Sequence, residues 1–393
     1  MDFRMSVGRG LLALCLAILA ATYAMPCSAK VIKARSGLTA DLQAAIYRAQ
    51  TGDTIVVPAG RFPFTGKVLA PDGIHIKGAG RDATYLIMSG PSTRGYAMIT
   101  VDARTGRPFI FSGITLQGRL DQLQGANRQT AVTKVQDQGL LIKGAAKDVQ
   151  IYDSRFTKFT RAGIELIGSQ GSAPGEQTGV IYHNEFIDNW YTYLGYGVAV
   201  VGSPASWRRP VRLGTADAIF VEDNLFRRNR HCVTSSNGGN FVARHNLVED
   251  NYQDAAAFDA HGLVPSWPRG TRTVEIYQNT VRNSIRRWAG AQIRGGSGVV
   301  WGNHWSGVTH GVVLTLENPP RSRPLVSYPA LDQIGNPGRV YVWDNVPDDV
   351  FVTPTPNSRG IDYWLRQDRD YFLSPKPGYE PYPYPHPLRA VSR

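Results

Sequence analysis

The sequence contains little cysteine. Its 393 residues include three cysteines, at positions 15, 27 and 232. If the first 29 residues are removed during export, only Cys232 remains and no internal disulfide can form. This excludes the small, disulfide-stapled scaffolds that many exported proteins use, so a hydrophobic core alone must stabilise the fold.

Acidic residues are also scarce. There are 31 Asp and Glu residues against 43 Lys and Arg residues, which gives a net charge of +12. Residues 1–29 carry two arginines and one aspartate, so +11 remains on the rest of the chain. In an exported protein this excess suggests an acidic partner, such as a polyuronate, a sulfated or phosphorylated polymer, or an anionic cell surface. Of these we expect an acidic polysaccharide, with no nucleic acid, bound by a monomer. A proteome that is basic throughout would give the same balance.

Long apolar runs are limited to one. Residues 11–21, LLALCLAILAA, follow two arginines and precede small residues at positions 27–29. This order predicts a secretory signal peptide at residues 1–29, with cleavage after Ala29 or, as second choice, after Ala24. The run is too short for a stable membrane span. We therefore expect a secreted or periplasmic protein with no integral membrane segment once the signal is removed.

A repeat runs through the middle of the sequence. Each copy has an apolar residue three positions before a marker Asn, and the shortest spacing between markers is 22 residues. A strand-rich unit this short cannot bury its own apolar face, so stacked copies must form the core, as in a β-solenoid. Asn suits the turn because its side chain bonds its own backbone and tolerates left-handed dihedrals. The marker positions are Ser154, Asn184, Asn224, Asn246, Asn279, Asn303 and Asn345.

Both ends of the predicted solenoid are marked as well. Residues 38–53 predict an amphipathic helix with Thr39 as N-cap and Gly52 as stop, which would cover the open edge of the first coil. From residue 347 the chain becomes rich in Pro and Tyr, which predicts an extended tail. The predicted organisation is therefore a β-helix domain at 30–346 and a tail at 347–393.

The opening of the mature chain resembles a known superfamily. LQAAIYRAQTGDTIVVPAG (42–60) followed by IHIKGAG (74–80) is similar to the usual start of the right-handed parallel β-helix superfamily of pectate-lyase-like proteins. The resemblance covers roughly residues 36–346 and implies an all-β, right-handed parallel β-helix. It does not imply one activity, because the superfamily holds lyases, hydrolases, epimerases, esterases and adhesins.

A second strand alternates with each Asn segment. These strands begin at residues 163, 197, 231, 257, 290 and 311. Aligned on their first residues, they place mostly apolar residues at the second and fourth positions, so the first, third and fifth should face outward. The middle three coils concentrate polar residues on that outward face, namely His231, Ser235, Asp259, His261, Gln292 and Arg294. Asp259, His261 and Arg294 should then lie within about 8 Å of one another.

Two insertions leave the same end of this strand column and should wall one side of a cleft. They carry aromatic and Arg side chains, which suit a sugar polymer because flat apolar faces stack on rings and Arg binds carboxylates. Another aromatic residue enters from the opposite end. The predicted substrate-binding residues are Gln292, Ser235, Trp207, Arg208, Arg209, Trp267, Arg272 and Trp288.

The outward polar residues suit proton abstraction next to a carboxylate. Arg294 would stabilise the enolate-like charge. His261 would be the base, because histidine ordinarily titrates near neutrality, and Asp259 would orient it or act as the base itself. His231 would protonate the leaving oxygen. The predicted reaction is β-elimination by a polysaccharide lyase on a uronate-containing polysaccharide, and reprotonation from the other face would give a C5-epimerase.

Other activities find less support in the sequence. The Asp-Ala-His run at 259–261 resembles the Asp-Pro-His motif of alginate C5-epimerases of this fold, whereas the combined motifs of polygalacturonases are missing. Outward carboxylates are few for a hydrolase, which needs two. The sequence shows no cluster of acidic residues of the kind that binds calcium. We therefore expect no metal and no cofactor. A non-catalytic polysaccharide-binding or adhesin β-helix remains the alternative from another class.

Overall fold

The computed structural model describes residues 29–90, 95–123, 135–170, 177–191, 193–252, 255–262, 267, 269–317, 339–357, 360–362 and 365–390. The predicted signal peptide, Ala29 excepted, lies outside the described residues. Within the described part, no helix is both long and apolar enough to span a membrane.

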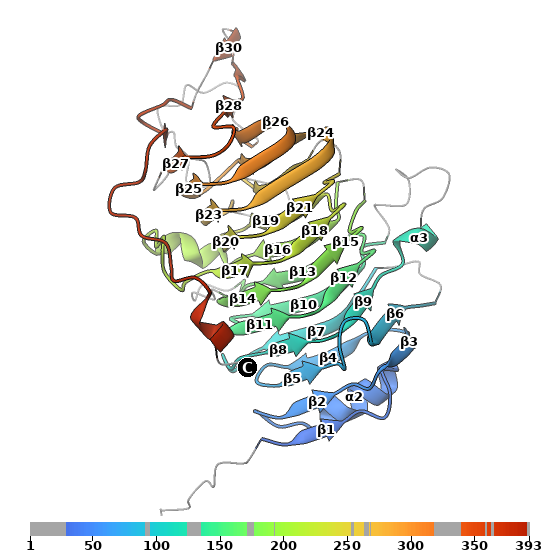
Figure 1. The fold of residues 1–393 in the computed structure, drawn as a ribbon. Helices are drawn as coiled ribbons and strands as arrows, with labels where there is room; N and C mark the ends of the chain where they lie inside the picture. The colour runs from blue at the N-terminus through green and yellow to red at the C-terminus, as the bar shows by residue number, and fades with distance from the viewer. Residues whose placement is uncertain are drawn as a thin grey trace, which may run out of the picture.

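Short strands that pair in parallel, coil upon coil, dominate the described chain (Figure 1). One column is a sheet of 12 strands. In spatial order these are β1 (Val31–Lys33), β2 (Thr54–Val56), β5 (His75–Lys77), β8 (Ile110–Ser112), β11 (Val149–Tyr152), β14 (Gly179–Tyr182), β17 (Ile219–Glu222), β20 (Asn240–Arg244), β23 (Thr273–Tyr277), β25 (Ser297–Trp301), β27 (Val340–Trp343) and β31 (Tyr371–Phe372).

The other sheet has 17 strands in two further columns. The first column contains β3 (Gly60–Phe64), β6 (Thr84–Met88), β9 (Thr115–Gln117), β12 (Arg155–Thr157), β15 (Glu185–Ile187), β18 (Leu225–Arg227) and β21 (Leu247–Glu249). The second contains β4 (Val68–Pro71), β7 (Ala97–Ala103), β10 (Gln138–Gly144), β13 (Ala162–Ile167), β16 (Tyr196–Val201), β19 (His231–Ser236), β22 (Ala256–Ala260) and β28 (Val350–Val352). Both columns include β24 (Thr280–Ile293) and β26 (His304–Leu314), which are long enough to span them.

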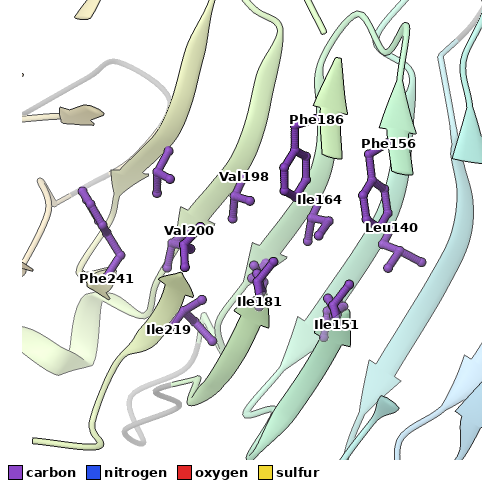
Figure 2. Close-up of a cluster of buried hydrophobic side chains, with 14 of the residues drawn as sticks. Leu140, Ile151, Phe156, Ile164, Ile181, Phe186, Val198, Val200, Ile219 and Phe241 are labelled. Carbon is purple, nitrogen blue, oxygen red and sulfur yellow. The ribbon is translucent and has the colours of Figure 1, made fainter. Parts of the chain in front are cut away.

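These three columns form a parallel β-helix, and the predicted all-β, right-handed solenoid fold is confirmed. Like residues stack along its interior. The rings of Phe156, Phe186 and Phe226 follow one another with centroid distances of 5.2 and 4.8 Å, close to the spacing of neighbouring strands. Figure 2 shows the first two of these rings beside the aliphatic side chains of the other columns. Each coil therefore buries its apolar face only against the next.

The marker asparagines form the predicted ladder. Asn246 is typical: its Nδ2 donates to the Arg244 carbonyl two residues back at 3.0 Å and to Asn279 Oδ1 in the next coil at 2.9 Å. Its Oδ1 accepts from the backbone N–H and the Nδ2 of Asn224, both at 3.1 Å. The same bonds continue through Asn303 to Asn345. The ladder thus fixes the turn and couples successive coils.

The residue before each marker, and not the marker Asn itself, adopts the left-handed backbone conformation. The sequence had suggested the Asn, because this residue type tolerates left-handed dihedrals. The Asn is then free to direct its amide along the stack, while the preceding residue turns the chain. The φ values lie between 50° and 63° at Asp153, His183, Asp223, His245, Gln278, Gly302 and Asp344.

A helix covers the first coil, as predicted. It is α2 (Thr39–Tyr47), which buries Leu42, Ala45 and Ile46. The predicted N-cap is wrong: Leu38 holds that position without a side-chain cap, and the Thr39 hydroxyl instead accepts from the backbone N–H of Thr65 at 3.0 Å. The hydroxyl of the first helical residue, Thr39, thus bonds the turn at Thr65 instead of capping the helix. The other short helices are α3 (Leu120–Leu123), η1 (Pro204–Arg208) and η3 (Pro387–Ala390).

The stack continues into the predicted tail. Beyond residue 346, β28 and β31 still pair with solenoid strands, and β29 (Thr355–Asn357) pairs with β30 (Gly360–Asp362). The chain then runs back along the outside of the 12-stranded sheet (Figure 1). There the buried Arg244 pairs with Glu222 at 2.6 Å and donates to the carbonyls of Tyr382 (2.6 Å) and Pro383 (2.8 Å). The final segment is therefore extended and packed.

The Asn ladder predicts the cost of breaking it. We expect Asn246→Ala to lower the free energy of unfolding by roughly 2–4 kcal/mol, because several buried partners lose their hydrogen bonds together. Asn283→Ala is the matched control, since that half-buried Asn makes two bonds, to Asn251 N and Gly307 O. It should cost about 1 kcal/mol. Urea unfolding of both variants measures the difference, and equal losses would contradict a special role for the ladder.

Candidate active site

The outer face of the second strand column carries the predicted polar residues. Hydrogen-bonded pairing fixes which residues stack: Val198 lies beside Val233, Val233 beside Phe258, and Phe258 beside Ala291. All of these are buried in the core. The residue after each of them faces outward, which gives the row Glu165, Ala199, Thr234, Asp259, Gln292 and Val313.

The sequence alignment of β19 is wrong by one position. His231 pairs with Tyr196 instead of Gly197, and Thr234 instead of Val233 lies beside Asp259. Ser235 pairs with the core residue Ala260 and is buried, so its side chain does not face outward. The predicted outward position of Ser235 is therefore wrong, and this residue lies beneath the site. The reason is the composition of this strand. Two apolar residues are followed by three small polar ones, so the alternation does not select a register.

Asp259, His261 and Arg294 contact one another, which confirms their predicted proximity. Asp259 is fully buried, and its Oδ1 accepts from Arg294 Nε at 3.0 Å while its Oδ2 lies 3.0 Å from His261 Nε2. Arg294 Nη2 lies 2.7 Å from His261 Nδ1. Arg294 Nη2 also lies 3.0 Å from His261 Nε2, so the guanidinium approaches both ring nitrogens and does not select a tautomer.

Glu317 completes this network, and the sequence analysis missed it. Its Oε1 accepts from Arg294 Nη1 at 2.6 Å, and its Oε2 lies 3.3 Å from His261 Nδ1 and accepts from the Gly262 N–H at 2.8 Å. Glu317 follows the end of β26, outside the aligned strand, so no repeat position pointed to it. The imidazole of His261 therefore lies between two carboxylates that share one guanidinium.

The electrostatics of Asp259 follow from this arrangement. Burial alone would raise the pKa of Asp259, but Arg294, His261 and His231 outweigh it and hold that pKa well below its usual range. Asp259 is therefore an anion at every pH at which the protein is expected to work. A buried anion of this kind orients the neighbouring imidazole and cannot act as an acid.

His231 is also buried, and its surroundings argue against the predicted acid role. Its side chain is 2% exposed. Its Nδ1 lies 2.7 Å from the Ala256 carbonyl, so Nδ1 carries the proton and Nε2, 3.4 Å from Asp259 Oδ2, does not. Burial, followed by the charge of Arg230, lowers the pKa of His231 to about 3. A neutral histidine without a proton on Nε2 has none to give to a leaving group.

A pocket of about 420 Å³ opens beside this network. His261 and Thr234 line it, together with Tyr196 and Leu194 from the coil before and Trp267 from an insertion. Tyr196 packs against the His231 ring at a centroid distance of 5.7 Å. Burial raises the pKa of the Tyr196 hydroxyl, which therefore keeps its proton at neutral pH. The Tyr196 hydroxyl donates to the Tyr193 carbonyl at 3.3 Å, so the wall of the pocket carries an imidazole and a protonated phenol that is hydrogen-bonded to the backbone.

The opposite end of the pocket is closed by a second ion pair. Arg161 donates to both carboxylate oxygens of Glu165, at 2.7 and 2.6 Å, and Gln138 donates to the same carboxylate. Glu165 lies in the same outward row as Asp259. Because Arg161 satisfies it in a bidentate pair, Glu165 is not free to act as an acid or a nucleophile.

The two insertions pack on each other. Trp207 Nε1 donates to the Gly270 carbonyl at 3.1 Å, and the Arg272 guanidinium lies 4.9 Å from the Trp207 ring centroid. Arg272 also donates to the Arg209 carbonyl at 2.5 Å. A separate groove includes Arg209 and Arg272, and Arg208 is exposed. Of the predicted wall residues in these insertions, the structure therefore places only Trp267 at the pocket.

The remaining predicted residues lie farther along the stack. Gln292 is beside Asp259 on the outer face, between it and Val313. Trp288 packs edge-on against His310 at 5.0 Å and against Phe351 at 6.2 Å. Gln292 is thus in reach of a polymer that lies along the stack, whereas Trp288 belongs to an aromatic cluster beyond the polar network.

Fold and site together define a parallel β-helix protein with a polar pocket on one sheet face. No protein-family model and no curated protein matches the sequence. Solved structures are similar to it: an alginate lyase from Paenibacillus sp. str. FPU-7 (17% identity, 73% of this chain and 98% of the other, TM-score 0.43); the A-module of the mannuronan C-5 epimerase AlgE6 from Azotobacter vinelandii (16%, 83% and 79%, TM-score 0.47); and a polygalacturonase from Erwinia carotovora (14%, 83% and 93%, TM-score 0.44). At such identities and scores these likenesses leave the activity open.

The pKa of His231 predicts how stability depends on pH. Unfolded histidine takes up a proton below about pH 6.5, whereas folded His231 stays neutral down to about pH 3. Stability is therefore lost as the pH falls between these values, by about 1.4 kcal/mol per pH unit from this group. His231→Gln should remove that slope. Chemical denaturation of both proteins from pH 7 to pH 4.5 measures it, and parallel pH profiles would contradict the assignment.

Proposed function

We propose that the protein is an exported polysaccharide lyase that cleaves a uronate-containing polysaccharide by β-elimination. The observation that carries the proposal is the position of His261, which lines the pocket while Asp259 and Glu317 lie on either side of its ring. Asp259 Oδ2 lies 3.0 Å and Glu317 Oε2 3.3 Å from the ring nitrogens, so both carboxylates can accept a hydrogen bond from a protonated ring. Export rests on the predicted signal peptide, and a monomeric state is part of the proposal.

The proposed reaction uses two groups of one pocket. His261 takes the proton from C5 of a uronate through its imidazole, and the resulting imidazolium lies between Asp259 and Glu317. The electron pair of the C5–H bond forms the C4–C5 double bond, and the C4–O bond to the neighbouring sugar breaks. Tyr196 lines the same pocket and gives its hydroxyl proton to the leaving oxygen.

Arg294 has a different role in this proposal from the one expected. Its guanidinium is engaged by Asp259 and Glu317, so it holds these carboxylates around His261 and is not available to bind a substrate carboxylate. Arg294 is thus a positioning residue. Removing it would leave two buried or half-buried carboxylates without their cation, which is costly.

The alternatives differ in how well the pocket suits them. A C5-epimerase would use the same two groups, with the proton removed by His261 and another returned by Tyr196 from the opposite face. A hydrolase is disfavoured because it needs a carboxylic acid that holds its proton, whereas the pKa of Asp259 is lowered and Arg161 occupies Glu165. A binding groove without catalysis would use the same surface without proton transfer.

The test is an incubation of the protein, lacking residues 1–29, with polymannuronate, polyguluronate and polygalacturonate. We expect ultraviolet absorbance from unsaturated ends to rise, and His261→Gln to lower the rate by at least about 100-fold, because general-base catalysis contributes that much. Trp207→Phe, in an insertion away from the pocket, is the control and should keep the rate within about twofold.

A flat absorbance trace with the wild-type protein on all three polymers would overturn the lyase proposal. Proton exchange at C5 in deuterated water then separates the alternatives. Deuterium incorporation without new ends would identify an epimerase, and its absence would leave a binding protein.

A further inference from the structure

One cation beside the pocket has no counter-ion among the described residues. Arg230 immediately precedes His231, and its guanidinium carbon lies 5.9 Å from the centroid of the Tyr196 ring. Its Nη1 is buried and has no hydrogen-bond partner in the part of the chain that the structure describes. A buried donor without a partner costs free energy, so such a group commonly meets an acceptor that is supplied from outside.

The other arginines of the pocket differ from Arg230 in this respect. Arg161 is held by Glu165, and Arg294 is held by Asp259 and Glu317. These pairs leave no positive charge over for an incoming carboxylate. Arg230, by contrast, has no counter-ion among the described residues, and its charge contributes to the low pKa of the buried His231.

Aromatic rings flank Arg230 along the stack. Trp190 follows Asn189 in the preceding coil, and Tyr252 follows Asn251 in the next one. Backbone bonds place the three in one row, since Arg230 N donates to Asn189 O and Tyr252 N donates to Asn229 O. The rings of Trp190 and Tyr252 stack at a centroid distance of 4.5 Å. This corner of the solenoid thus combines a stacked aromatic pair with a guanidinium whose buried Nη1 has no hydrogen-bond partner among the described residues.

Arg230 lies on the same edge of the sheet as the pocket wall. It occupies the backbone position that Arg161 holds two coils earlier, because Gly195 N donates to Arg161 O and Arg230 N donates to Gly195 O. Arg161 and Tyr196 both line the pocket. A sugar polymer that enters the pocket over Tyr196 therefore passes the Arg230 corner with the neighbouring ring.

We propose that Arg230, with the stacked Trp190 and Tyr252, forms a uronate subsite next to the pocket, in which Arg230 binds the sugar carboxylate and the aromatic pair supports the ring. This rests on the proposed function for the identity of the substrate. It assigns acidic-sugar recognition to Arg230 and proton transfer to His261, so the two roles belong to separate residues. Carboxylate binding by a guanidinium and ring stacking on an aromatic face are independent contributions.

The test measures binding, so that it does not depend on turnover. Isothermal titration with short oligouronates, in the His261→Gln background, is compared with the same oligosaccharides after reduction of their carboxyl groups. The unsubstituted Arg230 protein should prefer the acidic form by roughly 10- to 100-fold, as charged hydrogen bonds provide. Arg230→Gln should abolish this preference and Arg230→Lys should keep part of it. Arg282→Gln is the control, because Arg282 is exposed on another strand column.

The outcomes separate the subsite from the reaction. Acidic preference that Arg230→Gln removes supports the subsite, even if the wild-type protein cleaves nothing. Equal loss in Arg282→Gln, or an acidic preference that survives in a folded Arg230→Gln protein, would overturn it, even if the wild-type protein is a lyase. Thermal unfolding of each variant checks that it is folded. Failure of any oligouronate to bind would also overturn the subsite.

Discussion

The parallel register between coils is the constraint on which the rest of this structure depends. Every strand of the three columns repeats the backbone position of the strand one coil below, so side chains from distant parts of the sequence stack about 5 Å apart. The Asn ladder fixes this repeat at one corner, because each amide bonds its own turn and the next Asn. Insertions of different length between coils then leave the alignment of the strands unchanged. A site can therefore be assembled from three coils without any contact between neighbours in sequence.

The candidate site shows what this arrangement makes possible. Asp259 projects outward from its strand and is nevertheless fully buried, which is unfavourable for a lone carboxylate. One coil farther, Arg294 supplies the compensating charge, and Glu317 shares that guanidinium. The network is thus held together by its own electrostatics, and His261 takes its orientation from it. Because the cation is used internally, recognition of an acidic sugar would have to come from elsewhere on the face, which is the role proposed for Arg230.

The sequence could predict the fold because each coil of the solenoid repeats the same residue pattern. Marker asparagines and alternating apolar residues recur from coil to coil, so one irregular copy does not change the predicted fold. The site depends on single copies, and there the prediction was less secure. Cys232 and Val233 offer two equivalent registers for one strand, which moved Ser235 to the wrong face. Glu317 lies beyond the last aligned strand. The pairing of Trp207 with Arg272 is a contact between two insertions, and no repeat governs it. Asp259, His261 and Arg294 were placed correctly because their strands alternate clearly.

Two outer faces of the solenoid differ: that of the 12-stranded sheet is covered, and that of the second column of the other sheet carries the pocket. The 12-stranded sheet projects an aromatic row that includes Tyr182, Phe220 and Tyr277, and the end of the chain covers it with Tyr382 and Leu388. Buried Arg244 anchors that cover through Glu222 and two backbone carbonyls. The second column of the other sheet keeps its polar pocket open. One face is therefore covered by the chain's own C-terminal segment, while another keeps a pocket in which paired charges hold a few side chains in a fixed geometry.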